Sequence, residues 1–356
     1  MNTEGVKQQI SDERKSVLSY LDSYLDEWEG MRDDSTRWRK DTAERMSEMV
    51  KRGKIVRGAL VLKTCRMYGN NECRDAEKVA GAIELLHTGL LMHDDIIDRD
   101  DYRRGIKTFS RQYRELAEEE EIDSQHHFGI GMAMTAGDIG YFMGQGLLSK
   151  IESDPNTRKE ITELVFSEFS SVGLAEQIDI YSGYSTREAS EEEIMQLYRD
   201  KTARYTFSLP MKAGALLADV EEDEIQRLYE LGEKIGIIFQ LRDDELELFG
   251  EEEETGKSLG SDLEENKKTL HRLKLLEKLP EEEAKEMKER LRGDLSRQDK
   301  IEIRDRMEET GVRKEVRDRM EELAEETHGR LDDLDAPEPY RKFLSGMIDF
   351  CLYRDK

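Results

Sequence analysis

Apolar residues recur at helical spacing along most of the chain. In residues 80–91 and 235–246 they return every three or four positions. The strict alternation of β-branched and polar residues that marks a strand is nearly absent. The pattern predicts helices over residues 55–68, 75–98, 191–218 and 223–249, and one or two amphipathic helices within residues 1–50. The fold class is therefore expected to be all-α.

The texture of the chain indicates one domain. No Pro-rich or Gly/Ser-rich stretch separates two halves, and the 356 residues contain only 5 Pro. Gly and Ala at close intervals in residues 129–148 suggest helices that approach each other closely. Residues 250–268 read as a charged loop, and the Glu, Lys and Arg of residues 280–335 suggest outer helices. We expect residues 1–356 to form a single tight helix bundle.

Composition excludes some classes of function. The chain is 39% charged with a net charge of −26 and has no basic stripe, so we expect no nucleic-acid partner. No run of about 18 apolar residues exists to span a bilayer, and the polar first residues do not resemble a signal peptide. As a hypothesis, the acidic surface is an adaptation to concentrated salt. Maximal stability in dilute buffer, instead of in molar KCl, would refute it.

The spacing of the cysteines indicates the redox environment in which the protein is expected to occur. Cys65, Cys73 and Cys351 show neither CxxC spacing nor His partners at metal-finger distance. We expect three reduced and mostly buried thiols, as in a cytoplasmic protein.

Two acidic clusters carry the candidate chemistry. Asp94, Asp95 and Asp98 form the first, while Asp243, Asp244 and Glu247 have the same i, i+1, i+4 spacing in the second. On a helix this spacing gathers the carboxylates at one level, where they repel unless a cation neutralises them. Mg²⁺ prefers one or two carboxylates together with water and phosphate oxygens. Such a pattern alone is often a solvated face. Here, strongly apolar segments precede both clusters, which favours a diphosphate clamp.

Two arginines follow the first cluster. Arg103 and Arg104 could take up phosphate oxygens through their guanidinium groups. The alternative is simple pairing with Asp100 and Asp101. The sequence leaves both open.

The motifs together resemble a known family. Residues 84–98, with residues 103–108 after them, closely resemble the first aspartate-rich region of the trans-isoprenyl diphosphate synthases. Residues 201–203, 239–244, 255–257, 261–263 and 266–270 follow the order and spacing of that family, and residues 324–353 are also similar. The resemblance implies a bundle of antiparallel helices around a central apolar cavity. It also implies a Mg²⁺-dependent prenyltransferase that commonly forms homodimers.

The resemblance also implies roles for individual residues. Metal ions would bridge the allylic diphosphate to Asp94, Asp98 and Asp243, with Asp95 and Asp244 as water-mediated or indirect partners. Arg103, Lys201, Lys257 and Lys267 would bind the same diphosphate, while Lys54, Arg57, His87 and Arg104 would hold isopentenyl diphosphate. Thr202 and Gln240 would lie beside the allylic cation and stabilise it with their dipoles. Ionisation, condensation and loss of a proton then need no side-chain nucleophile.

The sequence departs from the family pattern at three places. The second cluster ends in Glu247 where the family has Asp, which puts metal ligation by that residue in doubt. The loop at residues 53–58 has Gly where the family usually has Pro. The GQxxD element appears only loosely, at residues 176–179, and receives no assignment.

The helix residues that precede the first cluster are expected to limit the length of the product. Gly89 lies five positions before Asp94, about 7–8 Å below it along the helix. In the family a bulky aromatic at this level stops growth, so Gly89 predicts a longer product, geranylgeranyl diphosphate (C20). Alternatively, Gly89 permits helix contact, and Phe142 or Met143 forms the floor. A farnesyl (C15) or C25 and longer synthase, a class I terpene cyclase and a catalytically silent scaffold remain as rival functions.

Overall fold

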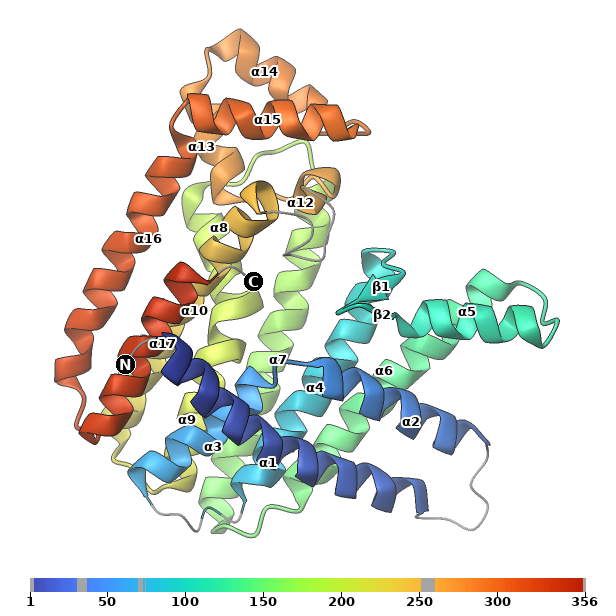
Figure 1. The fold of residues 1–356 in the computed structure, drawn as a ribbon, viewed down its shortest axis with the longest axis vertical. Coiled ribbons are helices and arrows are strands. Elements are labelled where there is room, and N and C mark those ends of the chain that lie inside the picture. Colours follow the sequence, from blue (N-terminus) through green and yellow to red (C-terminus); the bar gives the residue numbers. More distant parts are fainter. Residues whose placement is uncertain (1–2, 31–36, 70–72, 74, 251–259, 355–356) are drawn as a thin grey trace. The chain divides into compact units, whose positions relative to one another are not determined.

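The computed structural model describes residues 3–30, 37–69, 73, 75–250 and 260–354. Its regular elements are helices apart from one two-stranded hairpin, so the predicted all-α class is confirmed (Figure 1). The chain divides into two compact units. We call residues 7–163 and 213–220 the N-terminal unit, and residues 1–6, 164–212 and 221–356 the C-terminal unit. The single domain over residues 1–356 stays a prediction.

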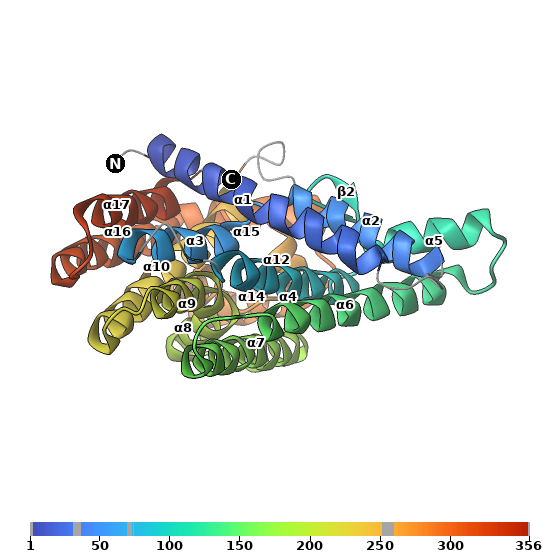
Figure 2. The same ribbon diagram turned by 90° about the horizontal axis from the view of Figure 1, so that it is seen from below.

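The N-terminal unit is built around one buried helix, α4 (Ala76–Ile97), which packs between α3 (Val56–Tyr68) and α6 (Gln125–Ser149). Helix α5 (Phe109–Glu119) lies along α6, and α1 (Thr3–Gly30) and α2 (Arg37–Arg52) complete the unit (Figure 2). A Cβ atom added at Gly89 of α4 would lie 2.8 Å from the carbonyl oxygen of Gly137 in α6. The two backbones therefore touch, which confirms the close approach expected for residues 129–148.

A tight hairpin follows α4. Strands β1 (Tyr102–Arg103) and β2 (Ile106–Lys107) pair antiparallel, with Arg103 opposite Ile106. The two residues between them, Arg104 and Gly105, have φ of 53° and 76°. Positive φ at both central positions is the requirement of a type I′ turn, which matches the twist of the strands. The hairpin thereby folds Arg103 back toward the end of α4.

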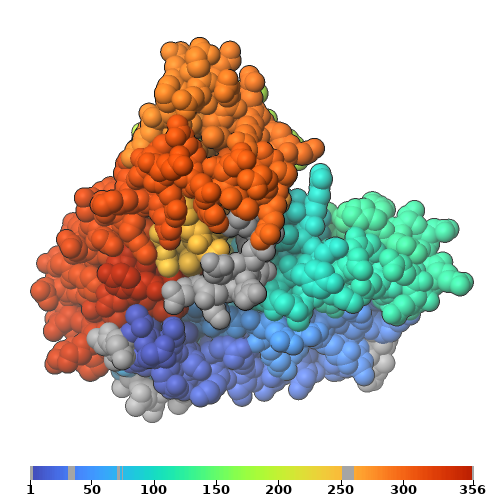
Figure 3. Space-filling view, turned by 45° about the horizontal axis from the view of Figure 1, so that its top comes forward, coloured from blue at the N-terminus to red at the C-terminus, as the bar shows by residue number. Residues whose placement is uncertain are grey.

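The C-terminal unit is arranged around α10 (Glu222–Phe249), which packs against the neighbouring η1 (Arg199–Ser208), α16 (Val312–Gly329) and α17 (Glu338–Tyr353). Its other elements are most of α7 (Pro155–Tyr184), α8 (Glu191–Tyr198), part of α9 (Leu209–Leu217), α12 (Ser261–Glu264), α13 (Leu270–Lys278), α14 (Glu281–Arg290), α15 (Arg297–Glu309) and η2 (Arg330–Asp333). Helix α14 buries no side chain, and Figure 3 shows it at the surface in orange.

Two predicted elements differ from the structure. Residues 191–218 do not form one regular α-helix, because η1 within them is a π-helix in which the N–H of Leu209 bonds to the carbonyl of Arg204, five residues back. Pro210 follows directly and can neither donate to nor fit against the carbonyl four residues before it. The predicted loop at residues 250–268 contains the short helix α12.

The cysteine prediction is wrong for two of the three residues. Cys65 at the end of α3 forms a disulfide with Cys73, while Cys351 is free and buried. The eight-residue separation carries no motif that would have revealed the pair. None of the described helices combines the length and apolar character that crossing a membrane requires.

Candidate active site

The first acidic cluster ends α4, and its adjacent carboxylates have different environments. The side chain of Asp94 is 26% exposed and that of Asp95 only 1%. The guanidinium of Arg103 joins them, donating from NH2 to Asp94 Oδ2 over 2.7 Å and from Nε to Asp95. Burial raises the pKa of Asp95 to about 6, although the charge of Arg103 opposes the shift. Asp94 therefore remains the accessible carboxylate, and Asp98 caps the helix end.

Arg103 does not pair mainly with Asp100 and Asp101, as the alternative interpretation of the two arginines proposed. Its guanidinium reaches Asp100 only at 3.9 Å, and Asp101 is bound instead by Arg114 over 2.8 Å. Arg103 is committed to Asp94 and Asp95.

His87 lies two turns before Asp94 on α4, and basic residues from other elements lie near it. Burial lowers the pKa of His87 well below its usual value, and the charges of Arg57, Arg104 and Arg103 lower it further. The imidazole is therefore neutral. Glu84, one turn away, is buried and accepts the N–H of Gly58 over 2.8 Å. Burial raises the pKa of Glu84, and the positive charges of Arg57 and Arg104 oppose that shift. This cluster has the donors that a diphosphate needs.

The loop that carries Lys54 has an unusual backbone. Ile55 has φ of 54°, a conformation that costs a β-branched residue roughly 1–3 kcal/mol and that clusters at functional sites. Gly53 lies against Arg104, because a Cβ added there would lie 2.7 Å from NH1 of that guanidinium. The departure from the family at residues 53–58 also has a physical reason. Gly58 supplies an N–H to Glu84 that proline lacks.

In the second cluster, the adjacent aspartates again differ. The side chain of Asp243 is 44% exposed and forms an ion pair with Arg354, whereas Asp244 is buried. Burial raises the pKa of Asp244 well above its usual value, and the negative charge of Asp262 adds to that shift. Glu247 accepts hydrogen bonds from the hydroxyl of Ser261 and, over 2.7 Å, from the N–H of Asp262 at the start of α12. These contacts give Glu247 a structural role.

A hydrogen-bond chain leads from the π-helix to the second cluster. The hydroxyl of Thr202 donates to Gln240 Oε1 over 2.7 Å, and Gln240 Nε2 donates to Asp244 Oδ1 over 2.7 Å. The buried hydroxyl of Tyr198 donates to the other oxygen of Asp244. A Cβ at Gly236 would lie 2.3 Å from the Cα of Ala203, so α10 and η1 touch backbone to backbone here. The hydrogen bonds to Thr202 and Asp244 fix the orientation of the Gln240 amide.

Two lysines of the predicted site lie in acidic surroundings. Lys201 pairs with Glu176 at 2.9 Å and with Asp179, the loosely matched element of the sequence. Burial opposes its charged form, yet the negative charges of Asp179 and Glu176 raise the pKa of Lys201 above its ordinary value. Lys267 pairs with Asp262 and Glu265. Lys257 lies outside the described residues.

Sequence reasoning missed four residues of these clusters. Asp179 had a weak signal in the GQxxD spacing, and Glu84 belonged to a quoted motif but received no role. Tyr198 and Arg354 had no signal, because their contacts depend on tertiary packing.

The chemistry of the donors fits a divalent metal that brings other ligands with it. Among the described residues, no three His, Cys, Asp or Glu side chains gather closely enough to form a metal site alone. Mg²⁺ commonly binds through one or two carboxylates plus substrate phosphates. Asp94 and Asp243 are the exposed members of their pairs and suit this mode. One oxygen of Asp95 is buried without a hydrogen bond, an indication that the first cluster is electrostatically incomplete.

The space beside Gly89 is filled by α6. A Cβ there would lie 2.9 Å from the ring of Tyr141, and this ring packs edge to face on His93 with centroids 5.3 Å apart. Gly89 thus permits contact with α6, as the alternative interpretation held. Met143 is buried, whereas the side chain of Phe142 is 69% exposed.

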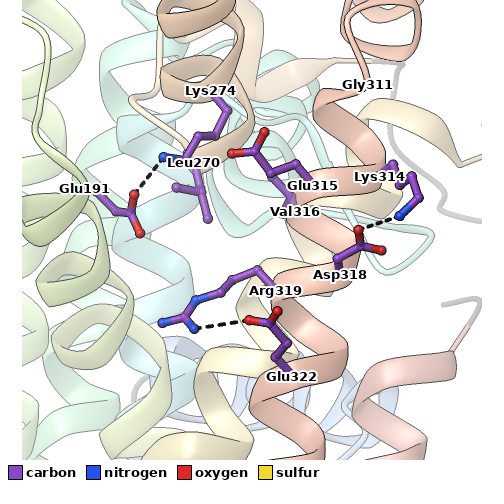
Figure 4. A pocket seen from close by; sticks show the side chains of 10 residues that line it. All are labelled: Glu191, Leu270, Lys274, Gly311, Lys314, Glu315, Val316, Asp318, Arg319 and Glu322. Carbon is purple, nitrogen blue, oxygen red and sulfur yellow. Dashed lines mark hydrogen bonds and ion pairs between the residues drawn. The ribbon is translucent and has the colours of Figure 1, made fainter.

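A pocket of about 440 Å³ in the C-terminal unit contains none of the predicted site residues. It lies between α13 and α16, and its cations are paired: Lys274 with Glu191, Lys314 with Asp318 and Arg319 with Glu322 (Figure 4). The paired charges make it an ordinary surface groove.

The all-α fold, the two acidic clusters and their cations define a class of enzyme that ionises and joins prenyl diphosphates. The chain belongs to the polyprenyl synthetase family, whose model matches residues 39–307. It is an isoprenyl diphosphate synthase, hence a trans-prenyltransferase. The scaffold alternative is therefore wrong.

Individual relatives agree on the family and differ in product. The chain is 32% identical over 310 residues to the short chain isoprenyl diphosphate synthase of Methanothermobacter thermautotrophicus, covering 85% of this chain and 87% of that one. It is 33% identical to the farnesyl diphosphate synthase of Bacillus subtilis, covering 63% and 72%. The crystal structure of geranylgeranyl pyrophosphate synthase from Corynebacterium glutamicum complexed with isoprenyl diphosphate and magnesium superposes with a TM-score of 0.89 at 26% identity, covering 97% of this chain and 99% of that chain.

Proposed function

We propose that this enzyme condenses isopentenyl diphosphate with an allylic diphosphate to give all-trans geranylgeranyl diphosphate. The observation that carries the proposal is the pair of exposed carboxylates, Asp94 and Asp243, each beside a buried Asp and an arginine. The relatives named above support the reaction class, and their names include both C15 and C20 synthases. The product length is therefore our own inference.

The proposed roles of the residues follow from their charges. Asp94, Asp98 and Asp243 would hold Mg²⁺, which when bound supplies positive charge to the departing diphosphate. Arg103, Lys201, Lys257 and Lys267 bind the allylic diphosphate, while Lys54, Arg57, His87 and Arg104 bind isopentenyl diphosphate. The neutral imidazole of His87 contributes a hydrogen bond and no charge.

Thr202 and Gln240 are proposed to stabilise the allylic cation. The amide of Gln240 is held at both ends, by the hydroxyl of Thr202 and by Asp244. A dipole that is fixed in this way need not reorient as charge develops, which is the most effective form of electrostatic stabilisation.

Incubation with Mg²⁺, isopentenyl diphosphate and farnesyl diphosphate tests the reaction. We expect a C20 alcohol on chromatography after dephosphorylation, and no product with EDTA. Lys201→Gln should lower turnover by about 100-fold. Lys342→Gln, an exposed lysine of α17, is the matched control. A hydrocarbon product, as a terpene cyclase gives, or no product with any allylic diphosphate would refute the proposal.

The length limit is proposed to lie at the ring of Tyr141, which packs against Gly89. Gly89→Phe cannot test this, because its ring would collide with the α6 backbone. Tyr141→Ala opens space at the same level without separating the helices. We expect products longer than C20 from Tyr141→Ala. An unchanged length would remove Gly89 and Tyr141 as determinants and favour Met143.

We also propose that the enzyme is a homodimer. Phe166, Leu174, Ile178 and Tyr181 expose an apolar stripe along one face of α7. Apolar stripes of this kind mark protein interfaces, and most soluble oligomers are symmetric dimers. Sedimentation should give twice the chain mass, and the Leu174→Lys, Ile178→Glu double variant should give monomers. A monomeric wild type would refute this.

A further inference from the structure

Arg354 closes the described chain beside the second acidic cluster. It follows α17, and its N–H bonds to the carbonyl of Phe350 over 3.0 Å. Its side chain is 3% exposed and forms an ion pair with Asp243 Oδ1. A buried guanidinium requires partners for its charge, and Asp243 is an anionic partner of this one.

Other contacts also hold the guanidinium in place. It lies 3.7 Å from the ring centroid of Phe239 and donates to the carbonyl of the same residue over 3.2 Å. The carbonyl of Arg354 accepts Nε of Arg242 over 2.9 Å. The three contact residues on α10 have the spacing i, i+3 and i+4, namely Phe239, Arg242 and Asp243. Arg354 therefore packs against a single face of that helix. The site is built for this arginine.

A metal ion at Asp243 would meet a cation already in place. Two positive charges on one carboxylate repel each other, and the burial of the Arg354 guanidinium reduces the screening by water on that side of Asp243. Binding of the ion and closure of the Arg354 pair therefore oppose each other. By thermodynamic linkage, each must weaken the other by the same factor.

We propose that Arg354 is a displaceable counter-ion of Asp243, which competes with the divalent metal and ties the end of α17 to the second acidic cluster in its absence. This inference rests on the proposed function, since that function assigns the metal to Asp243. It makes metal binding at Asp243 depend on Arg354, a residue at the C-terminal end of the described chain.

The test compares Arg354→Gln with Lys342→Gln, which removes the same charge from an exposed position on α17. Mg²⁺ is titrated in the presence of inorganic diphosphate, and Tm and isothermal calorimetry report binding without turnover. We expect Arg354→Gln to lower the half-saturating Mg²⁺ concentration by about fivefold or more. Half-saturation that is unchanged or raised relative to the control would overturn the proposal, and a raised value would make Arg354 a residue that positions Asp243.

A second measurement needs no variant and covers the case in which Arg354→Gln fails to fold. Hydrogen exchange of the wild-type peptide covering residues 345–354 should become faster when Mg²⁺ and diphosphate are added. Unchanged or slower exchange, with calorimetry showing that the metal binds, contradicts the inference. Turnover of the same wild-type preparation with isopentenyl and farnesyl diphosphates, measured without added inorganic diphosphate, tests the proposed function separately.

Discussion

The two acidic clusters solve the same electrostatic problem by different means. In both, the first aspartate is accessible and the second is buried. In the N-terminal unit one arginine bridges the pair. In the C-terminal unit, Arg354 binds the accessible Asp243, and the buried Asp244 receives hydrogen bonds from the neutral groups of Tyr198 and Gln240.

The two clusters differ in how the charge of the buried carboxyl group is balanced. The pKa of Asp95 rises only to about 6, because burial is opposed by Arg103, so Asp95 is an anion at neutral pH. The pKa of Asp244 rises well above its usual value, because burial and the negative charge of Asp262 outweigh two hydrogen bonds. Equal spacing in sequence thus conceals two buried carboxyl groups in different surroundings, one paired with a guanidinium and one bonded to uncharged donors.

The largest expected effect concerns the exposed members. Asp94→Asn and Asp243→Asn should each lower kcat by about 100-fold or more, since each loses a charge proposed to act on the leaving group. Steady-state assays at saturating Mg²⁺ measure this. Asp305→Asn on α15 changes an exposed charge elsewhere and serves as the control. Normal kcat in either site variant would break the proposed equivalence of the clusters.

The buried members should differ in stability. Asp95→Asn should lower the free energy of unfolding by about 2 kcal/mol, because Arg103 loses an ionic partner. Asp244→Asn should cost less than about 1 kcal/mol, because its partners Tyr198 and Gln240 carry no charge that would lose an ionic partner. Urea denaturation followed by circular dichroism provides the values. Equal losses would show that the ionic partner of Asp95 does not distinguish the two buried groups.

The last comparison isolates one neutral donor. Tyr198→Phe removes the hydroxyl that donates to Asp244 and accepts the N–H of Leu270 over 3.1 Å, which should cost about 1 kcal/mol. Tyr184→Phe on the exposed end of α7 should be neutral. Identical unfolding curves for both variants would mean that the hydroxyl of Tyr198 does not support Asp244.

Local patterns predicted the helices but not how their side chains pair. The predicted helices at residues 75–98 and 223–249 match α4 and α10 within one residue, because their apolar positions are strictly periodic. The π-helical turn at Lys201 and Thr202 was not predicted, since hydrophobic spacing does not distinguish it from an α-helix.

The site shows the same limit. The acidic spacing identified Asp94 and Asp243, yet the exposure of one Asp and burial of the next depend on tertiary neighbours. Arg354 lies 111 positions after Asp243, and no local pattern links them. The disulfide of Cys65 was missed because cysteine spacing alone does not determine pairing.

The hairpin after α4 constrains the number of its residues as well as their identity. Arg103 points to Asp94 and Asp95, while Arg104, the first turn residue, lies against Gly53. Side chains alternate with a period of two in such a ribbon, so losing or gaining one residue would exchange their directions. A single-codon insertion or deletion in the hairpin would therefore turn the guanidinium of Arg103 away from Asp94 and Asp95.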